Sequence, residues 1–299
     1  METIVTRPAA ATDRALDGLA RWFHSRLTRP GFLVRRTFGT PALDDAALAE
    51  RLASALRAET RMDGSVRGEF VTTAWRAIEL MDLDHGQDQS GTIRVIGYLL
   101  ARQDEPGAYG ETVARSEHRG RRLGGFFSPA DPRTSIAPLT LPTGAVIADE
   151  ADARYAASCL GLRAALKARQ EERPQIRRHA ESLALLATDW GSVPMPLPLA
   201  CSTLHGLALA PAPMRAVIPG LIAQIGAAER HGSWVEADLF HVLQALLSVP
   251  DAAATELIGR SAPALLKLQR ADEGFDGEGG IGEERGWIAM RALLRARGE

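Results

Sequence analysis

Glycine turns recur along the chain at an almost constant interval, and this repeat constrains the fold more than any other feature of the sequence. The turns contain Gly64, Gly107, Gly191, Gly232 and Gly274, so the spacings are 43, 84, 41 and 42 residues. Because 84 is twice 42, the long interval holds one ordinary unit and an insertion of about a unit's length. Such a period is typical of helix-pair repeats, which bury their apolar faces only by stacking on neighbouring units.

Two helical segments follow most of these turns. The first segment is apolar nearly all round, as a buried inner helix should be, and the second keeps a polar face, as an outer helix should. The predicted inner helices are 70–80, 153–166, 199–209, 239–249 and 287–294, and the predicted outer helices are 93–103, 176–186, 214–228 and 256–269. The N-terminal stretch adds 15–26 as a sixth inner helix and 43–58 as an outer one. The sequence therefore predicts an all-α fold, an α/α toroid over residues 1–299 as a single domain.

The segment 110–149 interrupts the repeat. It carries four prolines and a basic cluster that includes Arg119, Arg121 and Arg122. Loops of this length are uncommon unless they are functional or disordered. We expect an insertion that forms a lid over one mouth of the toroid, with a disordered linker as the alternative. The arginines either bind the substrate by clamping a diphosphate or belong to a solvated basic loop.

Charge and cysteine content exclude several classes of protein. Lysine and arginine (35) nearly balance aspartate and glutamate (37), so no overall field attracts a nucleic acid. Two cysteines are too few for a disulfide framework and suit a reducing, cytoplasmic location. The first 23 residues lack the uninterrupted apolar run of a signal peptide, and five prolines in 190–214 would break a membrane span. Peripheral contact with a membrane is compatible with the sequence, and the oligomeric state is left open.

Two of the turns carry a glutamine at the end of the preceding outer helix and an aromatic residue beside the glycine. Gln269 precedes Gly274 and Phe275, and Gln103 precedes Gly107 and Tyr109. In this pattern the chain resembles the terpenoid cyclase and protein prenyltransferase superfamily, with squalene-hopene cyclase-like repeats. The resemblance covers most of the chain from residue 43 onward, apart from the insertion. It implies the toroid fold, with an amide that bridges the helix end to the turn and an aromatic ring that packs between units.

Polar groups at the inner-helix N-termini should converge on one mouth of such a toroid. The acidic residues there are the candidate catalytic residues Asp149, Glu150, Asp152, Glu236 and Asp238. Helix capping and the helix dipole also favour acids at these positions, which is the structural alternative. The resemblance to class II terpene cyclases places Asp152 at the proton donor of an Asp-x-Asp-Asp motif whose last aspartate is missing here. Glu150 would help to hold a proton on the pair.

This resemblance implies an enzyme of the isomerase or lyase type that cyclises an isoprenoid or another apolar small molecule after protonation. Aromatic rings near the inner-helix starts would stabilise a cationic intermediate. The candidate substrate-binding residues are Glu69, Trp75, Tyr155, Trp234, Phe240 and Trp287, together with Arg119, Arg121 and Arg122 of the insertion.

Two other functions are compatible with the sequence. A zinc-dependent prenyltransferase-like enzyme is implied by a cysteine at one inner-helix start and a histidine in the next repeat, with Cys201, His205 and His241 as metal ligands. Zinc or magnesium would then be the cofactor, whereas the cyclase would need none. The remaining alternative is a non-catalytic toroid that binds a lipid or a protein. The sequence does not identify the substrate.

Overall fold

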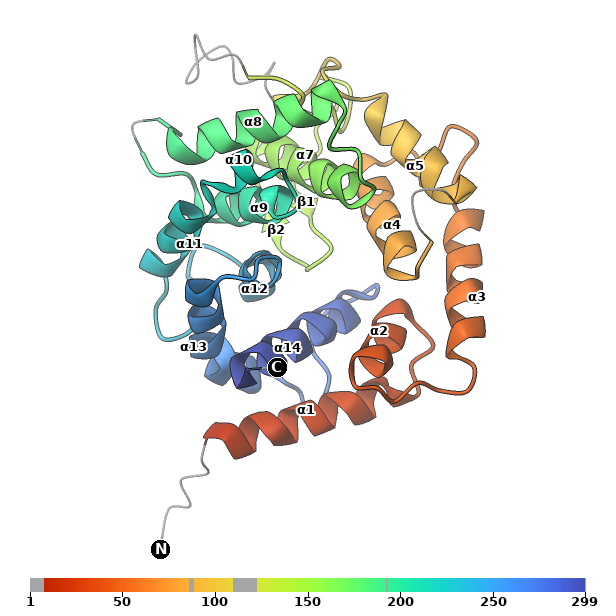
Figure 1. Ribbon diagram of the computed structural model, residues 1–299, viewed down its shortest axis with the longest axis vertical. Helices are drawn as coiled ribbons and strands as arrows, with labels where there is room; N and C mark the ends of the chain where they lie inside the picture. Colours follow the sequence, from red (N-terminus) through yellow and green to blue (C-terminus); the bar gives the residue numbers. More distant parts are fainter. Residues whose placement is uncertain (1–7, 86–88, 110–122, 192, 299) are drawn as a thin grey trace, which may run out of the picture.

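The computed structural model describes residues 8–85, 89–109, 123–191 and 193–298. Viewed along its shortest axis, the molecule is a ring of helices in two layers (Figure 1). The strands of the described chain are β1 (Leu139–Thr140) and β2 (Val146–Ile147), which form one antiparallel hairpin. The predicted all-α toroid is confirmed.

The inner layer consists of six helices in the described part of the chain. They are α2 (Arg29–Thr37), α4 (Phe70–Asp82), α7 (Glu150–Lys167), α9 (Leu197–Leu207), α12 (Leu239–Leu247) and α14 (Ile281–Arg297). Each helix packs against the next in this order, and α14 packs against α2, which closes the ring. Side chains of neighbouring inner helices therefore share one continuous core.

The outer layer supplies one helix to each inner helix. Its members are α1 (Pro8–His24), α3 (Asp45–Ala58), α5 (Ser90–Leu100), α8 (Pro174–Thr188), α11 (Ile218–Ala227) and α13 (Ala252–Leu268), with the short α10 (Ala212–Arg215) before α11. The proline-rich stretch 190–214 contains α9 and leads into α10. Within the described ranges, no helix combines the length and the apolarity needed to cross a bilayer.

The N-terminal helix pair differs from its prediction. Segment 15–26 was expected to be an inner helix, but it belongs to α1, which lies in the outer layer against α2, α13 and α14. The inner helix of this unit is α2, which has only nine residues and contains Arg29, Gly31 and Arg35. A search for apolar helices does not detect α2, because this helix directs charged side chains towards the interior of the ring.

The regular spacing of the glycine turns along the chain has a steric cause. Gly64 and Gly232 adopt φ values of +89° and +78°, which only glycine adopts readily. A Cβ atom at Gly64 would lie 2.2 Å from the carbonyl oxygen of Arg94 in α5, and one at Gly232 would lie 2.3 Å from that of Arg260 in α13. Each turn thus packs directly on the backbone of the outer helix of its own unit.

The glutamine and the aromatic residue of the last turn behave as the resemblance implies. The side-chain amide of Gln269 donates to the carbonyl oxygen of Glu273, 2.9 Å away, and the ring of Phe275 packs edge-on against Phe240 of α12. Gln103 differs, because its amide donates to the carbonyl oxygen of Gly125 in the insertion.

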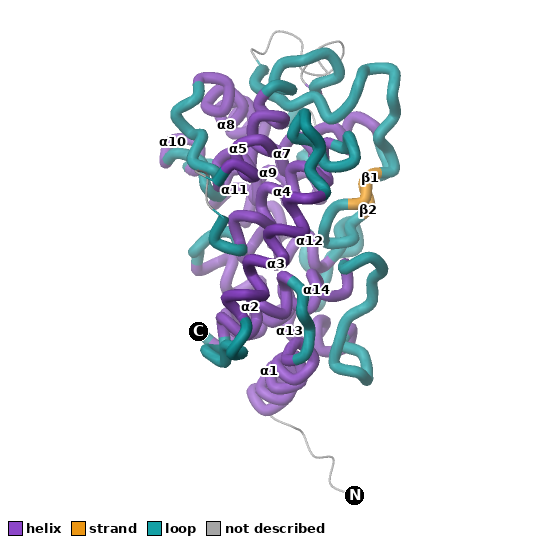
Figure 2. The backbone as a smooth tube through the Cα atoms, turned by 90° about the vertical axis from the view of Figure 1, so that its right-hand side faces the viewer, coloured by secondary structure: helices purple, strands orange, loops and turns teal. Residues whose placement is uncertain are grey.

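The insertion is described from residue 123 onward, while Arg119, Arg121 and Arg122 lie outside the described residues. Its hairpin lies on one flat face of the ring (Figure 2), where Leu141, Ala145 and Ile147 form a small apolar cluster with α7. Arg154 of α7 is 2% exposed and donates to the carbonyl oxygens of Gly107, Ala130, Asp131 and Thr134. A buried arginine therefore anchors the described part of the insertion to the inner ring.

Candidate functional site

A cavity of about 350 Å³ lies inside the ring and is lined by side chains from all six inner helices. This volume is within the range of small-molecule sites, roughly 300 to 1,000 Å³. The lining residues are Arg29, Leu33, Arg36, Thr37, Trp75, Ile78, Asp82, Arg163, Lys167, His205, Gln244, Ser248, Glu284, Trp287 and Arg291. The cavity is the candidate functional site.

Arg29 connects three inner helices at this cavity. The hydroxyl of Thr28 caps the start of α2, and this cap fixes the position of Arg29, the first residue of the helix. Its guanidinium lies 2.6 Å from a carboxylate oxygen of Asp82, 3.7 Å from one of Glu79, and forms a buried ion pair with Glu284. Burial acts most strongly and would lower the pKa of Arg29, but the three carboxylates together raise it. Arg29 is therefore a charged side chain whose ion-pair partners come from α4 and α14.

Glu284 is the most enclosed carboxyl group of the cavity, with a side chain that is 8% exposed. Burial raises the pKa of Glu284, and the neighbouring charges of Asp82 and Glu79 raise it further, while Arg29 opposes them. Glu284 therefore accepts a proton more readily than an exposed glutamate does.

Three more cations face the cavity near the C-terminal ends of α7 and α14. Lys167 forms an ion pair with Asp82, and Arg163 lies one helical turn earlier on the same face of α7. Burial and the charge of Arg291 together lower the pKa of Arg163 to about 10, against the opposing charge of Asp82. Burial also lowers the pKa values of Lys167 and Arg291. The cavity is thus polar and positively charged.

Trp75 and Trp287 line the same cavity. Both were predicted to bind substrate, and the structure brings them together from α4 and α14. The guanidinium carbon of Arg29 lies 5.1 Å from the ring centroid of Trp75, and that of Arg291 lies 5.5 Å from the centroid of Trp287. Each indole face thus already holds a cation.

The insertion covers the end of the cavity at the inner-helix N-termini. Leu141 and Pro142 meet α7, α9 and α12 around a void of about 20 Å³, which shares His205 and Gln244 with the central cavity. Leu141 is 5% exposed. This geometry suits a lid, although the exclusion of water during a reaction stays a prediction.

Three of the predicted catalytic acids lie at the start of α7, namely Asp149, Glu150 and Asp152. Asp149 is the N-cap, and its carboxylate accepts hydrogen bonds from the amides of Ala151 and Asp152 at 2.9 and 3.1 Å. Asp149 is therefore accounted for by the structural alternative. Asp152 is half-buried, and it is not among the side chains that line the central cavity.

Glu150 does not share a proton with Asp152 in the way the sequence suggested. One carboxylate oxygen accepts hydrogen bonds from the Ser135 hydroxyl at 2.7 Å and from the amides of Ile136 and Ala137 at 2.9 Å. The other lies 2.7 Å from Arg154. Burial would raise the pKa of Glu150, but these hydrogen bonds and the arginine lower it. Glu150 is therefore ionised and holds the insertion in place.

The predicted acids of the next repeats also lie outside the cavity lining. Asp238 caps α12 by accepting hydrogen bonds from the amides of Phe240 and His241, and it forms a 3.1 Å ion pair with Arg285 of α14. Glu236 is exposed in the turn before α12. A catalytic role for either residue stays a prediction without support from the cavity.

The other predicted substrate-binding residues have structural contacts. Tyr155 is fully buried, and its hydroxyl lies 2.6 Å from that of Thr203. The indole N–H of Trp234 donates to the carbonyl oxygen of Ile225 at 2.8 Å. Phe240 packs on Phe275 as described above, and Glu69 is exposed at the N-cap of α4. None of these four residues is part of the cavity lining.

The predicted metal ligands do not form a metal centre. Cys201 is fully buried, and burial raises the pKa of its thiol well above the ordinary value, which disfavours the thiolate that zinc requires. His241 directs Nε2 towards the Ser202 hydroxyl and the Pro198 carbonyl oxygen. Within the described ranges, no group of three or more histidine, cysteine, aspartate or glutamate side chains is placed to hold a metal ion. The spacing of Cys201, His205 and His241 reflects a buried helix face, and these residues are core or cavity-wall residues.

The charged side chains of the cavity were missed as site residues by sequence reasoning. Arg163 and Lys167 stand at i and i+4 on an inner helix, and Arg291 interrupts another inner helix. Charges on otherwise apolar inner helices were the available signal, because a buried position retains a charge only where it has a role.

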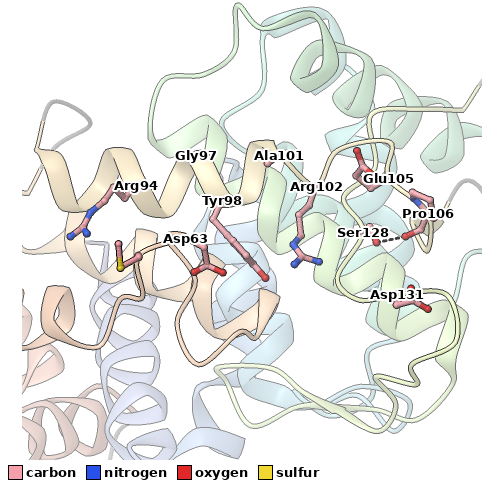
Figure 3. A pocket seen from close by; sticks show the side chains of 11 residues that line it. Asp63, Arg94, Gly97, Tyr98, Ala101, Arg102, Glu105, Pro106, Ser128 and Asp131 are labelled. Carbon is pink, nitrogen blue, oxygen red and sulfur yellow. Dashed lines mark hydrogen bonds between the residues drawn. The ribbon is translucent and has the colours of Figure 1, made fainter.

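A wider groove of about 750 Å³ lies on the outer layer, along α5 and the segment that follows it (Figure 3). Tyr98 of α5 and Arg102, just beyond the end of this helix, line it, with the guanidinium carbon of Arg102 4.7 Å from the tyrosine ring centroid. Because one outer helix and surface loops form the groove, it lacks the enclosure that small-molecule sites usually have.

Comparisons with known proteins place this architecture in a fold class. No family model matches the sequence, and no curated protein matches it. Among solved structures, a type II terpene cyclase from Scytonema, MstE, is similar over 98% of this chain and 99% of its own, with a TM-score of 0.57 and 12% sequence identity. That structure is an aspartate-to-asparagine variant in complex with its substrate, geranylgeranyl dihydroxybenzoate.

A second solved structure, of a protein from Actinoplanes, is similar over 97% of this chain and 100% of its own, with a TM-score of 0.56 and 15% identity. The chain therefore has a terpenoid cyclase-like α/α toroid fold along nearly its whole length. At these identities the likeness shows the fold alone.

Proposed function

We propose that the protein binds a small organic molecule in the central cavity of the toroid. The observation that carries this proposal is the cavity itself, because all six inner helices contribute side chains to one enclosed space. Concave sites with a few converging polar groups are the usual small-molecule sites of proteins.

The lining favours a ligand that carries charge. Leu33, Ile78 and Trp287 offer an apolar wall, whereas arginine and lysine dominate the polar part. The apolar, isoprenoid-like substrate expected from the sequence fits this cavity as one portion of a ligand that also has an anionic group. A purely hydrocarbon ligand would leave the charged side chains desolvated without compensation.

Acid-initiated, terpenoid cyclase-like chemistry on an isoprenoid is the second candidate. Two observations favour it, namely the toroid fold and a buried carboxyl group with a raised pKa, Glu284, which lines the same cavity as two tryptophans. A general acid must hold its proton near the operating pH, and the pKa of Glu284 is shifted in that direction. Glu284 is therefore a better candidate for the proton donor than Asp152. The nearby cations count against a carbocation in this cavity.

A fragment screen tests the binding proposal. Small organic compounds are screened by ligand-observed NMR against the wild type and two variants. Ser248→Phe places a ring at the central cavity, and the matched control Gly97→Phe places one in the outer groove, where a Cβ meets nothing within 4 Å. We expect hits that bind the wild type and Gly97→Phe but not Ser248→Phe. Hits that are lost only in Gly97→Phe would contradict the proposal and assign binding to the groove.

Product formation from farnesyl diphosphate, geranylgeranyl diphosphate and squalene tests the cyclase. If Glu284 is the acid, Glu284→Gln should abolish turnover while Asp152→Asn retains it, and the reverse result would restore Asp152. A wild type inactive on all three substrates would leave the non-catalytic binding function as the stronger one.

A further inference from the structure

We propose that the part of the central cavity next to Arg163, Lys167 and Arg291 is a binding site for the phosphate group of an organic phosphate. This inference rests on the proposed function, because it assigns the anionic portion of the ligand that enters the cavity. It names a site for which no anion has been assigned, on residues that the fold does not need for its helices.

Two of the three cations lack a carboxylate partner. No aspartate or glutamate oxygen lies within 4.0 Å of the guanidinium nitrogens of Arg163 or Arg291 among the described residues. The Nη1 atom of Arg163 is buried and has no hydrogen-bond partner there. Arg291 makes one long hydrogen bond, 3.4 Å, to the carbonyl oxygen of Leu247. A cation partly withdrawn from water without an ion-pair partner is costly, so this arrangement favours the binding of an anion.

The other charges of the cavity are already paired. Arg29 has Glu79, Asp82 and Glu284 as neighbours, and Lys167 pairs with Asp82. Arg36, at the rim, pairs with Asp84 outside the cavity lining. Among the cations that line the cavity, Arg163 and Arg291 are therefore the two that have no carboxylate within 4.0 Å in the described part of the chain.

A dianion is the ligand that balances two guanidinium groups. A phosphate monoester carries close to two negative charges at neutral pH and presents three acceptor oxygens. Arginine binds phosphate by paired, charge-assisted hydrogen bonds, and lysine adds a point charge. His205, Gln244 and Ser248 line the same space with polar groups that suit the remaining polar part of such a molecule.

The electrostatics of the site agree with this assignment. Burial, together with the charge of Arg291, lowers the pKa of Arg163 to about 10. Burial and the charges of Arg163, Arg291 and Lys167 also lower the pKa of His205 far below its ordinary value, so this histidine is neutral and adds no charge. A bound phosphate would reverse these shifts, since an anion favours the charged forms.

Helix C-termini offer an alternative explanation for cations at this end of the ring. The partial negative charge of a helix end stabilises a lysine such as Lys167, the last residue of α7. It does not account for Arg163, which lies a full turn inside the helix and leaves a buried N–H group without an acceptor. The alternative therefore explains one of the three cations.

Isothermal titration with inorganic phosphate, pyrophosphate and succinate tests the inference. We expect phosphate and pyrophosphate to bind the wild type, and Arg163→Gln and Arg291→Gln each to weaken binding about tenfold or more. Arg215→Gln, which removes an exposed arginine at the end of α10, should leave binding unchanged. Absence of phosphate and pyrophosphate binding would overturn the inference, and tighter binding of succinate would replace phosphate by a dicarboxylate.

Thermal unfolding without ligand provides a second, independent readout. Arg163→Met removes a half-buried charge that has no carboxylate partner, so the ligand-free variant should melt at a higher temperature than the wild type and should lose the stabilisation by phosphate. A lower melting temperature, with phosphate stabilisation retained, would make Arg163 a structural residue. Fragments that Ser248→Phe displaces, but whose binding phosphate does not affect, would leave the proposed function intact. They would contradict only the anion site.

Discussion

At the scale of single residues, one type of side chain has different roles at the starts of two different inner helices. Glu150 and Glu284 are both glutamates near the start of an inner helix, yet the first receives hydrogen bonds from the insertion and the second lies beside two other carboxylates. The environments shift their pKa values in opposite directions. Sequence position alone does not separate the two roles, since capping residues and proton donors are the same residue types at the same helix positions.

The pH dependence of stability should report on Glu150. Its pKa is lowered in the folded protein, so its contribution is present above the pKa of the unfolded chain, about 4.3, and is lost as the pH falls through the folded value. We expect the difference in unfolding free energy between the wild type and Glu150→Gln to be constant at pH 6 and above and to shrink below pH 4.5. Urea titrations at several pH values measure it. A difference that grows on acidification would contradict the ionised, hydrogen-bonded state.

The site was only partly predictable at this scale. Trp75 and Trp287 were identified because aromatic residues near inner-helix starts are few and conspicuous. Arg29 and Asp82 were not, because each acquires its significance from a partner on a different helix. Their ion pair depends on how α2 packs against α4, which no local pattern of the sequence specifies.

At the scale of elements, the described hairpin of the insertion depends on one arginine of α14. Arg285 donates to the carbonyl oxygen of Thr143 at 3.0 Å and pairs with Asp238 at the start of α12. It therefore ties the hairpin to two inner helices. The hairpin itself has few backbone hydrogen bonds, among them Leu141 N–H to Ala145 at 2.8 Å.

Removal of that tie should loosen the hairpin without unfolding the ring. We expect Arg285→Met to speed amide hydrogen exchange at Leu141 and Gly144 by about tenfold, because a hydrogen bond from a charged donor contributes roughly 1.5 to 3 kcal/mol. Exchange in the middle of α9 should stay unchanged. Unchanged protection at Leu141 would show that the apolar cluster with α7 holds the hairpin alone.

Most helix pairs were predictable because steric rules set their spacing. The glycine turns at Gly64 and Gly232 must approach a backbone carbonyl, and that requirement is visible as a 42-residue period. Helix α2 escaped prediction for the opposite reason. It is only nine residues long and three of them are arginines, so a search for apolar helices passes over it.

At the scale of the whole molecule, one guanidinium group joins the beginning of the ring to its end. Arg29 and Glu284 are 255 residues apart in the sequence and form a buried ion pair where α2 meets α14. A second pair, Arg297 with Asp13, links α14 to α1 at the surface, 2.8 Å apart. The buried pair matters more, because removal of its cation would leave carboxylates desolvated.

We expect Arg29→Met to destabilise the protein by about 3 to 5 kcal/mol, since three carboxylates lose their common partner. Part of this loss should be recovered in the double variant Arg29→Met with Glu284→Leu, which removes the most buried of the stranded charges. Chemical denaturation of the two variants and the wild type measures both effects. A double variant no more stable than Arg29→Met would show that the cost comes from lost packing and not from stranded charge.

Ring closure between α2 and α14 also sets an order of events during synthesis. A ribosome delivers α2 more than two hundred residues before α14, a delay of roughly 10 to 50 s at ordinary rates of translation. In that interval the surface of the first helix pair that packs against α14 has no partner, and Arg29 has no Glu284. The nascent chain must therefore expose this surface until the last inner helix emerges. This makes the N-terminal helix pair the segment most in need of a chaperone.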